Sequence, residues 1–314
     1  VTLNSEDIVL DIGSNDSTLL QAYPKRNLSL VGFDPTGIKF KKFYPDHITL
    51  IADFFNSRIF KKYFGNKKAK IITSIAMFYD LEEPLKFVRE VYDILSDDGI
   101  WVFEQSYMPL MLEVNAFDTI CHEHLEYYRL NQIHWMMEKV GFKIIGIEFN
   151  NINGGSFSVT VAKSESSFSE TPSLEKFLID EKNKGLDTNR PYEEFRSKVF
   201  EFKIKIREFL NNIHSEKKMV LGYGASTKGN VLLHFCNITS RDIPYIAEVN
   251  TDKFGCYTPG TLIPIISEKE ARNMNPDYFF VLPWHFKDFI LEKELSRTEG
   301  KVSLLFPLPS IKVF

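Results

Sequence analysis

Two histidines that flank a glutamate are the side chains in this sequence best suited to chemistry. His122, Glu123 and His124 lie beyond the carboxyl end of a predicted strand. An imidazole accepts a proton near neutral pH, and a neighbouring carboxylate orients it and favours its protonated form. A His-x-His pair could instead bind a metal ion or serve only packing, but no third ligand is evident nearby. The residue types therefore favour proton transfer, with Tyr107 or Tyr127 as the hydroxyl donor to an oxygen that gains negative charge.

A second group of residues has the pattern of a cofactor site. Residues 11–17, which read DIGSNDS, join a predicted strand to a predicted helix, and small residues there permit a tight turn and close backbone approach. Asp34 ends the next predicted strand, where a carboxylate accepts hydrogen bonds from a ribose diol. Asp53 and Phe54 follow the third strand and are expected to meet an adenine. The full expected set of cofactor-binding residues is Asp11, Gly13, Ser14, Asn15, Asp34, Asp53, Phe54, Ala76 and Met77.

The charge of this loop distinguishes between two cofactors. A nicotinamide dinucleotide places its pyrophosphate on the N–H groups of a GxGxxG motif at a helix N-terminus. Here Asn15, Asp16 and Ser17 follow Gly13, and the carboxylate of Asp16 would repel a pyrophosphate. S-adenosylmethionine has no phosphate and carries a cationic sulfonium, so the acidic loop favours it.

The elements that must position these groups alternate between strands and helices. The predicted strands of the first half are residues 9–12, 28–33, 48–52, 70–73 and 100–103. This alternation indicates a parallel sheet covered on both faces. Residues 142–149 and 157–162 are two further strands joined by a turn rich in Asn and Gly, which indicates a hairpin. A parallel sheet that closes with an antiparallel hairpin is typical of the Rossmann-like, seven-stranded methyltransferase fold.

The chain is long enough to bury two cores, and its pattern indicates two α/β domains. We expect residues 1–163 to bind S-adenosylmethionine, residues 164–216 to supply a linker and bridging helices, and residues 217–314 to form a second Rossmann-like domain. The predicted strands of that second domain are residues 219–223, 244–249, 278–282 and 302–306.

The second domain also contains a strand-to-helix loop, residues 222–230, which read GYGASTKGN. Its amides, two hydroxyls and a lysine could hold a phosphate, although it lacks the P-loop spacing, and the alternative is a glycine turn that serves packing. Trp284 and His285 follow a later strand and either line the same cleft or pack against it. The full expected set of substrate-binding residues is Asn153, Tyr223, Ser226, Thr227, Lys228, Asn230, Trp284 and His285.

Composition limits the partners and the location. The net charge of −4 argues against nucleic acid and anionic membranes as partners, because binding to phosphate backbones needs clustered basic residues. No apolar run approaches the length that spans a bilayer, and no signal pattern begins the chain, so we expect a cytoplasmic protein. The three cysteines show no CxxC spacing, which excludes a disulfide framework and a thiolate zinc site, so no metal is expected.

Seven segments, in the same order, resemble the sugar C-methyltransferase family, which methylates nucleotide-linked 4-keto deoxysugars. They are DIGSND at 11–16, FEQSY at 103–107, ICHEH at 120–124, NGGS at 153–156, GYGASTKGN at 222–230, TPG at 258–260 and PDY at 276–278. The resemblance implies S-adenosylmethionine as cofactor, a nucleotide-linked sugar as substrate, a C-terminal domain that contributes to binding it, and His124 as the base. For methylation at carbon, that base would remove a proton next to the ketone and generate an enolate.

The sequence departs from this family at two positions and over one segment. Ser17 stands where members usually have Gly, and Cys121 where they often have Tyr. Members also commonly begin with a cysteine-rich zinc domain, for which this chain has no residues, so a fragment or a divergent branch is expected. Three alternatives remain: an O- or N-methyltransferase on a sugar or other small molecule, a non-catalytic nucleotide-sugar-binding relative, and a nicotinamide-dependent sugar-nucleotide oxidoreductase, which Asp16 and the hairpin disfavour.

Overall fold

The computed structural model describes residues 1–24, 27–295 and 302–314 of the chain, which form two compact units. The first unit comprises Val1–Met108, Glu123–Asn150 and Gly155–Gly185. The second unit comprises Pro109–His122, Asn151–Gly154 and Leu186–Phe314. Two short segments of the N-terminal half are therefore part of the second unit. The chain returns to the first unit between His122 and Glu123.

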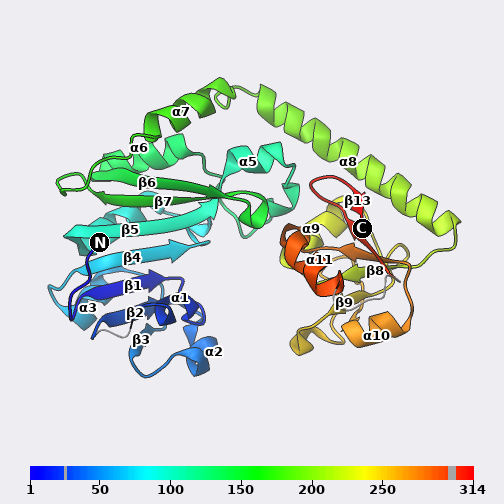
Figure 1. The fold of residues 1–314 in the computed structure, drawn as a ribbon, viewed down its shortest axis with the longest axis horizontal. Coiled ribbons are helices and arrows are strands. Elements are labelled where there is room, and N and C mark those ends of the chain that lie inside the picture. The colour runs from blue at the N-terminus through cyan, green and yellow to red at the C-terminus, as the bar shows by residue number, and fades with distance from the viewer. Residues whose placement is uncertain (25–26, 296–301) are drawn as a thin grey trace. The chain divides into compact units, whose positions relative to one another are not determined.

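The first unit contains a seven-stranded sheet in the order β3-β2-β1-β4-β5-β7-β6 (Figure 1). Its strands are β1 (Ile8–Ile12), β2 (Ser29–Phe33), β3 (Ile48–Ile51), β4 (Ala69–Ile75), β5 (Leu95–Ser106), β6 (Phe142–Asn150) and β7 (Ser156–Lys163). The first five strands are parallel, and β7 pairs antiparallel with both β5 and β6. The terminal hairpin confirms the seven-stranded Rossmann-like fold predicted from the sequence.

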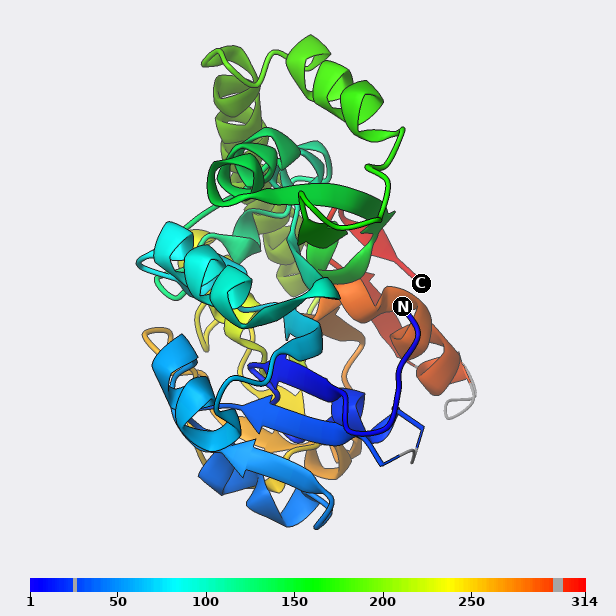
Figure 2. The ribbon, with the colours of Figure 1, turned by 90° about the vertical axis from the view of Figure 1, so that its left-hand side faces the viewer.

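Helices pack against this sheet and begin and end where the local sequence directs. They are α1 (Thr18–Gln21), α2 (Gly37–Phe40), α3 (Ser57–Phe64), α4 (Pro84–Ile94), α6 (Leu130–Val140) and α7 (Leu174–Asn183). Asn56 caps α3 by accepting the N–H of Arg58, and Gly141, with φ of 104°, ends α6. Helix α4 contacts both α3 and α6, and α6 contacts α7, so these helices form a continuous row (Figure 2).

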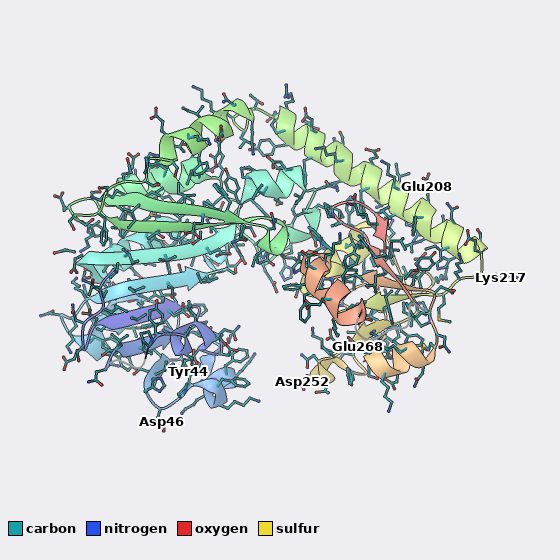
Figure 3. All side chains as sticks on the ribbon, in the orientation of Figure 1. Tyr44, Asp46, Glu208, Lys217, Asp252 and Glu268 are labelled. Atoms are coloured by element: carbon teal, nitrogen blue, oxygen red, sulfur yellow. The ribbon has the colours of Figure 1, made fainter. Side chains whose placement is uncertain are left out.

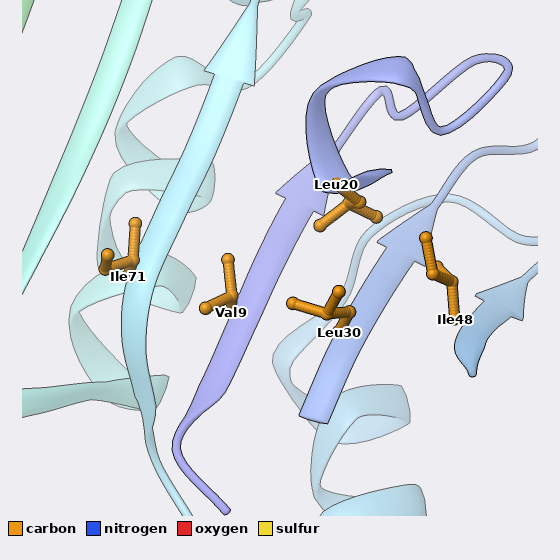
Figure 4. Packing of buried hydrophobic residues seen from close by; sticks show 5 residues of the cluster. All are labelled: Val9, Leu20, Leu30, Ile48 and Ile71. Atoms are coloured by element: carbon orange, nitrogen blue, oxygen red, sulfur yellow. The ribbon is translucent and has the colours of Figure 1, made fainter. Parts of the chain in front are cut away.

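A cluster of buried aliphatic side chains holds the beginning of the sheet together. Val9, Leu30, Ile48 and Ile71 come from four strands, and Leu20 reaches them from α1 (Figure 4). Each is less than a tenth exposed, and removing such side chains from water supplies most of the favourable free energy of folding. This packing fixes the loop between β1 and α1, which holds the predicted cofactor residues.

The second unit contains a six-stranded sheet in the order β10-β9-β8-β11-β12-β13. Its strands are β8 (Val220–Tyr223), β9 (Ile246–Glu248), β10 (Ile265–Ser267), β11 (Tyr278–Val281), β12 (Ser303–Phe306) and β13 (Lys312–Val313), and only β13 is antiparallel to its neighbour. The four strands predicted for this region correspond to β8, β9, β11 and β12. The short strands β10 and β13 were not predicted.

The remaining helices are α5 (Met108–Glu113), α8 (Arg190–Ser215), α9 (Thr227–Phe235), α10 (Glu268–Asn273) and α11 (Lys287–Leu295). Three short 3-10 turns also bear on the site, namely η2 (Phe78–Asp80), η3 (Phe117–Thr119) and η6 (Trp284–Phe286). In the part of the chain that the structure describes, no helix combines the length and the apolar character that crossing a membrane requires.

Candidate functional site

The loop after β1 is built for close approach of a ligand to the backbone. Gly13 has φ of 78°, and a Cβ atom placed on it would lie 3.4 Å from Cγ of Met77. Two hydrogen bonds hold the loop in place. Gly13 N–H donates to Phe33 O at 2.8 Å, and the Ser14 and Tyr44 hydroxyls lie 2.8 Å apart. Tyr44 also donates to the carbonyl of Asn15 (Figure 3). The predicted residues Gly13, Ser14, Asn15 and Met77 are thus brought together.

Two buried carboxylates lie beneath this loop. Asp34 accepts the Asn15 N–H at 2.9 Å, and its other oxygen accepts both the amide and the hydroxyl of Thr36 at 2.7 Å. Asp11 is 4% exposed and accepts the Thr73 hydroxyl at 2.5 Å. Burial raises the pKa of Asp11 to about 6, and the negative charge of Asp34 adds to this rise while the Thr73 bond opposes it. Two buried carboxylates thus lie close together at this loop.

The predicted adenine contacts lie at the end of β3. Asp53 accepts the N–H of Phe54 at 2.8 Å, and the Phe54 ring is 75% exposed. The next residue, Phe55, packs instead against Phe33 and Phe87, with ring centroids 5.5 and 5.3 Å apart. The strand end thus directs one phenylalanine inward and leaves the predicted one available for stacking.

The turn after β4 connects this loop to the predicted base. Ala76 has φ of 53° and donates its N–H to Glu104 O at 2.7 Å, and Met77 lies beside Gly13. Two residues further along, the ring of Tyr79 lies against the imidazole of His124, with centroids 4.4 Å apart. Ala76, Met77 and His124 were predicted as site residues from the sequence, whereas Tyr79 was not. Its place in the chain, two residues after Met77, was the available signal.

Two carboxylates, Asp80 and Glu123, lie close together near the predicted base His124. Partial burial raises the pKa of Asp80 to about 6, and the negative charge of Glu123 adds to this rise. Glu123 and His122 are exposed, whereas His124 is partly buried. His122 ends a segment of the second unit, and Glu123 begins the segment that returns to the first. Asp80 was not predicted as a site residue.

Tyr107 occupies a buried position with its hydroxyl engaged. The hydroxyl donates to Glu181 Oε1 at 2.7 Å, and Glu181 is 2% exposed. Glu181 also accepts the N–H groups of Leu130 and Asn131 at the first turn of α6, at 2.6 and 3.0 Å. A carboxylate at a helix N-terminus is favourably placed, so this glutamate holds both α6 and the Tyr107 phenol. Glu181 was not predicted as a site residue from the sequence.

The second unit repeats the glycine loop and adds a cavity of about 630 Å³ beside it. Gly224 has φ of 79°, and a Cβ atom on it would lie 2.8 Å from Cδ and Cγ of Pro283. Ser226 caps α9 by accepting the Gly229 N–H at 3.0 Å. The cavity is lined by Tyr223, Gly224, Ala225, Ser226, Ala247, Glu248, Val249, Lys253, Glu268, Pro283, Phe286, Phe289, Ile290 and Lys293.

Polar contacts on the cavity wall organise two lysines. Glu248 accepts the N–H groups of Ala225, Val249 and Asn250 at 2.7 to 3.0 Å, and these bonds lower its pKa against the opposing effect of burial. Lys253 lies 3.6 Å from Glu248 and donates to Ala225 O at 2.8 Å. Lys293 donates to the Tyr223 hydroxyl and to Glu268, which Figure 3 labels, at 2.8 and 2.7 Å.

Of the eight predicted substrate-binding residues, Tyr223 and Ser226 line this cavity. Thr227 and Asn230 lie on α9 outside it. The remaining four are Asn153, Lys228, Trp284 and His285, and they gather around Asp118 of η3, which was not predicted. Within the described residues, no group of three or more His, Cys, Asp or Glu side chains is arranged to hold a metal ion.

Asp118 is fully buried, and the Trp284 indole donates to its Oδ2 at 2.6 Å. Among the described residues its Oδ1 has no hydrogen-bond partner. Burial raises the pKa of Asp118 to about 6, against the opposing effects of the Trp284 bond and the charge of Lys228. Lys228 donates to Asn153 O at 3.4 Å, and burial lowers its pKa. Burial and the charge of Lys228 likewise lower the pKa of His285 to about 4.

Comparisons with known proteins agree with the two-part architecture. Residues 151–309 match the family model described as "C-methyltransferase C-terminal domain", and residues 2–147 match the one described as "Methyltransferase domain". The C-methyltransferase NovU of Streptomyces niveus is 26% identical over 314 residues, which is 100% of this chain and 75% of NovU.

Similar solved structures include LepI in complex with SAM, with 12% identity and a TM-score of 0.41 over 51% of this chain and 43% of LepI. Another is the methyltransferase bound to the Haloferax volcanii Trm112 activator, with 10% identity and a TM-score of 0.43 over 53% of this chain and 86% of that one. The chain spans less than half of LepI. The Rossmann-like fold is shown by the strand order of the seven-stranded sheet.

Proposed function

Because the chain belongs to the C-methyltransferase family and is an S-adenosylmethionine-dependent enzyme, we propose that it transfers the methyl group to a carbon of a nucleotide-linked keto sugar. One observation carries the proposal. A single turn, residues 76–80, places Met77 beside the cofactor loop at Gly13 and Tyr79 against the imidazole of His124. The methyl donor and a base are needed together for methylation at carbon.

The residues of the first loop fit S-adenosylmethionine. Bound there, this cofactor supplies an electrophilic methyl carbon. The exposed backbone at Gly13 and Asn15 permits close approach, and the acidic pair Asp11 and Asp34 suits a cationic sulfonium better than a pyrophosphate. We assign the ribose to Asp34 and the adenine to Asp53 and Phe54, in support of which the Phe54 ring is open to stacking.

In the proposed reaction, His124 removes the proton from the carbon next to the sugar ketone, and the electron pair moves to the carbonyl oxygen. The enolate carbon then forms a bond to the methyl carbon as the carbon–sulfur bond breaks, which releases S-adenosylhomocysteine. The imidazolium returns its proton to solvent. Glu123 and His122 set the charge and tautomer of the base. The enolate oxygen needs a hydrogen-bond donor, for which Tyr107 and Tyr127 are the two candidates.

We assign the nucleotide to the cavity of the second unit. Ser226 and the start of α9 offer hydroxyl and amide groups to a phosphate, and the ammonium groups of Lys253 and Lys293 lie on the same wall, paired with Glu248 and Glu268. Val249, Phe286 and Phe289 give the cavity an apolar rim that suits a base. Groups that can contact a phosphate and groups that can pack on a base thus line the same cavity, which supports this assignment.

The test compares two neighbouring histidines with a nucleotide-linked 4-keto deoxysugar as acceptor. His124→Asn should lower the methylation rate by roughly 10²–10⁴, the usual contribution of a general base, without changing S-adenosylhomocysteine affinity. His122→Asn should have a much smaller effect, because His122 acts only on the tautomer of the base and does not itself take the proton. Methylation by His124→Asn at the parent rate would contradict the proposed base, and product analysis showing a new O- or N-methyl group would favour the alternative chemistry.

A further inference from the structure

Tyr79 holds the segment of the candidate base in two ways. Its ring lies against the His124 imidazole, with centroids 4.4 Å apart and planes inclined by 54°. Its backbone carbonyl accepts the N–H groups of Leu125 and Glu126, each at 3.1 Å. The side chain is only 9% exposed, so its position is set by packing. One residue therefore restrains both the ring of His124 and the chain that follows it.

The turn that contains Tyr79 is itself rigidly held. Phe78 is fully buried, and its ring lies 5.4 Å from that of Phe103 and 6.0 Å from that of Trp101. At the other end of the turn, Met77 lies against Gly13 of the cofactor loop. Because interiors are close-packed, this turn cannot shift without disturbing the core on one side and the cofactor loop on the other.

We propose that Tyr79 is a positioning residue, which fixes the imidazole of His124 relative to the methyl-donor loop by ring packing. This inference rests on the proposed role of His124 as the base. A base held in productive geometry contributes strongly to the rate, and small misplacements lower it steeply.

The experiment is a double-mutant cycle with the full chain and a nucleotide-linked 4-keto deoxysugar. Tyr79→Leu removes the ring, Tyr79→Phe keeps it, and each is made in the parent and in the His124→Asn background. Tyr79→Leu in the parent should lower kcat by about 10- to 100-fold, with the sugar KM and S-adenosylhomocysteine affinity within about twofold. Tyr79→Phe keeps the ring contact with His124, so its loss of kcat should be clearly smaller than that of Tyr79→Leu. In the His124→Asn background, Tyr79→Leu should cause no further loss, because the two residues act as one unit.

Three results would overturn the inference. They are an unchanged kcat in Tyr79→Leu, an equal loss in both backgrounds, and a loss in Tyr79→Phe as large as in Tyr79→Leu. Thermal unfolding shows whether Tyr79→Leu is folded. If it shows no cooperative transition, Tyr79→Met replaces it in the cycle with the same expectations. Failure of the proposed function is distinguishable, because His124→Asn alone would then methylate at the parent rate whatever Tyr79 does.

Discussion

The two units build the same loop with different surroundings. In each, a glycine with nearly equal φ, 78° at Gly13 and 79° at Gly224, follows the strand of its sheet that comes first along the chain, β1 or β8. In each, the carboxylate that ends the neighbouring strand accepts an N–H group of the loop at 2.9 Å, Asp34 in the first unit and Glu248 in the second. The backbone geometry therefore does not decide which ligand each loop binds.

The charges near the loops do differ. The first loop covers Asp11, a second buried carboxylate, whereas the cavity beside the second loop has two lysines on its wall, Lys253 and Lys293, paired with Glu248 and Glu268. The acidic pair at the first loop favours a cation, whereas the second loop has ammonium groups nearby that an anion could contact. The comparison teaches that a strand–glycine–helix loop indicates a ligand site, and that the side chains around it specify the ligand's charge.

The largest effects should come from filling the two glycine positions. In Gly224→Ala the new methyl group would meet Pro283, whose ring cannot move aside, so we expect about 100-fold weaker nucleotide-sugar binding. In Gly13→Ala the neighbour is the flexible Met77, so S-adenosylhomocysteine affinity should fall only about 10-fold. Calorimetric titration of both ligands against both variants checks this. If both variants bound the same one of the two ligands more weakly, the assignment of different ligands to the two loops would be contradicted.

The next effect concerns Lys253, which lines the cavity beside the second loop, and Lys228, which does not. Lys253→Met should raise the nucleotide-sugar KM about 10-fold with little change in kcat, the signature of lost uniform binding energy. Lys228→Met is the control, because its ammonium is directed to Asn153 O instead of the cavity. Steady-state kinetics on both variants decide the matter. If Lys228→Met raised KM more than Lys253→Met, Lys228 would be the lysine that binds the phosphate, as the sequence motif predicts.

A smaller effect is expected from the pH dependence of donor binding. Because burial raises the pKa of Asp11 to about 6, the carboxylate becomes neutral as pH falls through that value, and its attraction for a cation is lost. The affinity for S-adenosylmethionine should fall by up to about 10-fold from pH 7.5 to 5, and that for the uncharged-sulfur product by less. In Asp11→Asn this difference between the ligands should vanish. Parallel pH profiles for the two ligands in the parent would contradict the charge assignment.

The smallest expected effect is on the free energy of unfolding, through Asp118, a buried carboxyl group of the second unit. The folded pKa of Asp118 is about 6 against an ordinary 3.8, so the folded state binds this proton more tightly, and the contribution of Asp118 to stability rises as pH falls from 7.5 towards 4. Between pH 7.5 and 5, the free energy of unfolding of the parent should gain about 1 kcal/mol relative to Asp118→Asn. Urea denaturation at the two pH values measures this. A constant gap would show that Asp118 does not titrate in this range.

The sequence predicts the parts of this molecule that have a regular local pattern. The strands of the first sheet and the hairpin of β6 and β7 follow from apolar runs and a turn rich in Asn and Gly. The strands β10 and β13, of three and two residues, were not predicted, whereas β9, which is as short as β10, lies within the longer predicted strand 244–249. Both unpredicted strands pair with a neighbour in the sheet, β10 with β9 and β13 with β12.

The site was only partly predictable because its side chains meet across long stretches of chain. Tyr107 and Glu181 are 74 positions apart, and Lys228 reaches a carbonyl 75 positions away. The local motif around Lys228 indicates a phosphate cradle, but the direction in which α9 projects this side chain depends on the packing of η3 and η6. Likewise, nothing in the sequence around Asp118 indicates that its carboxylate is fully buried beneath an indole.

The most direct test of the central claim is deuterium exchange into the sugar without a methyl donor. Only methylation at carbon through an enolate requires prior loss of a carbon-bound proton. The parent enzyme in D2O should therefore exchange the hydrogen next to the ketone of a nucleotide-linked 4-keto deoxysugar, and His124→Asn should not. No exchange by the parent above the buffer rate, or exchange that persists at the parent rate in His124→Asn, would contradict the account.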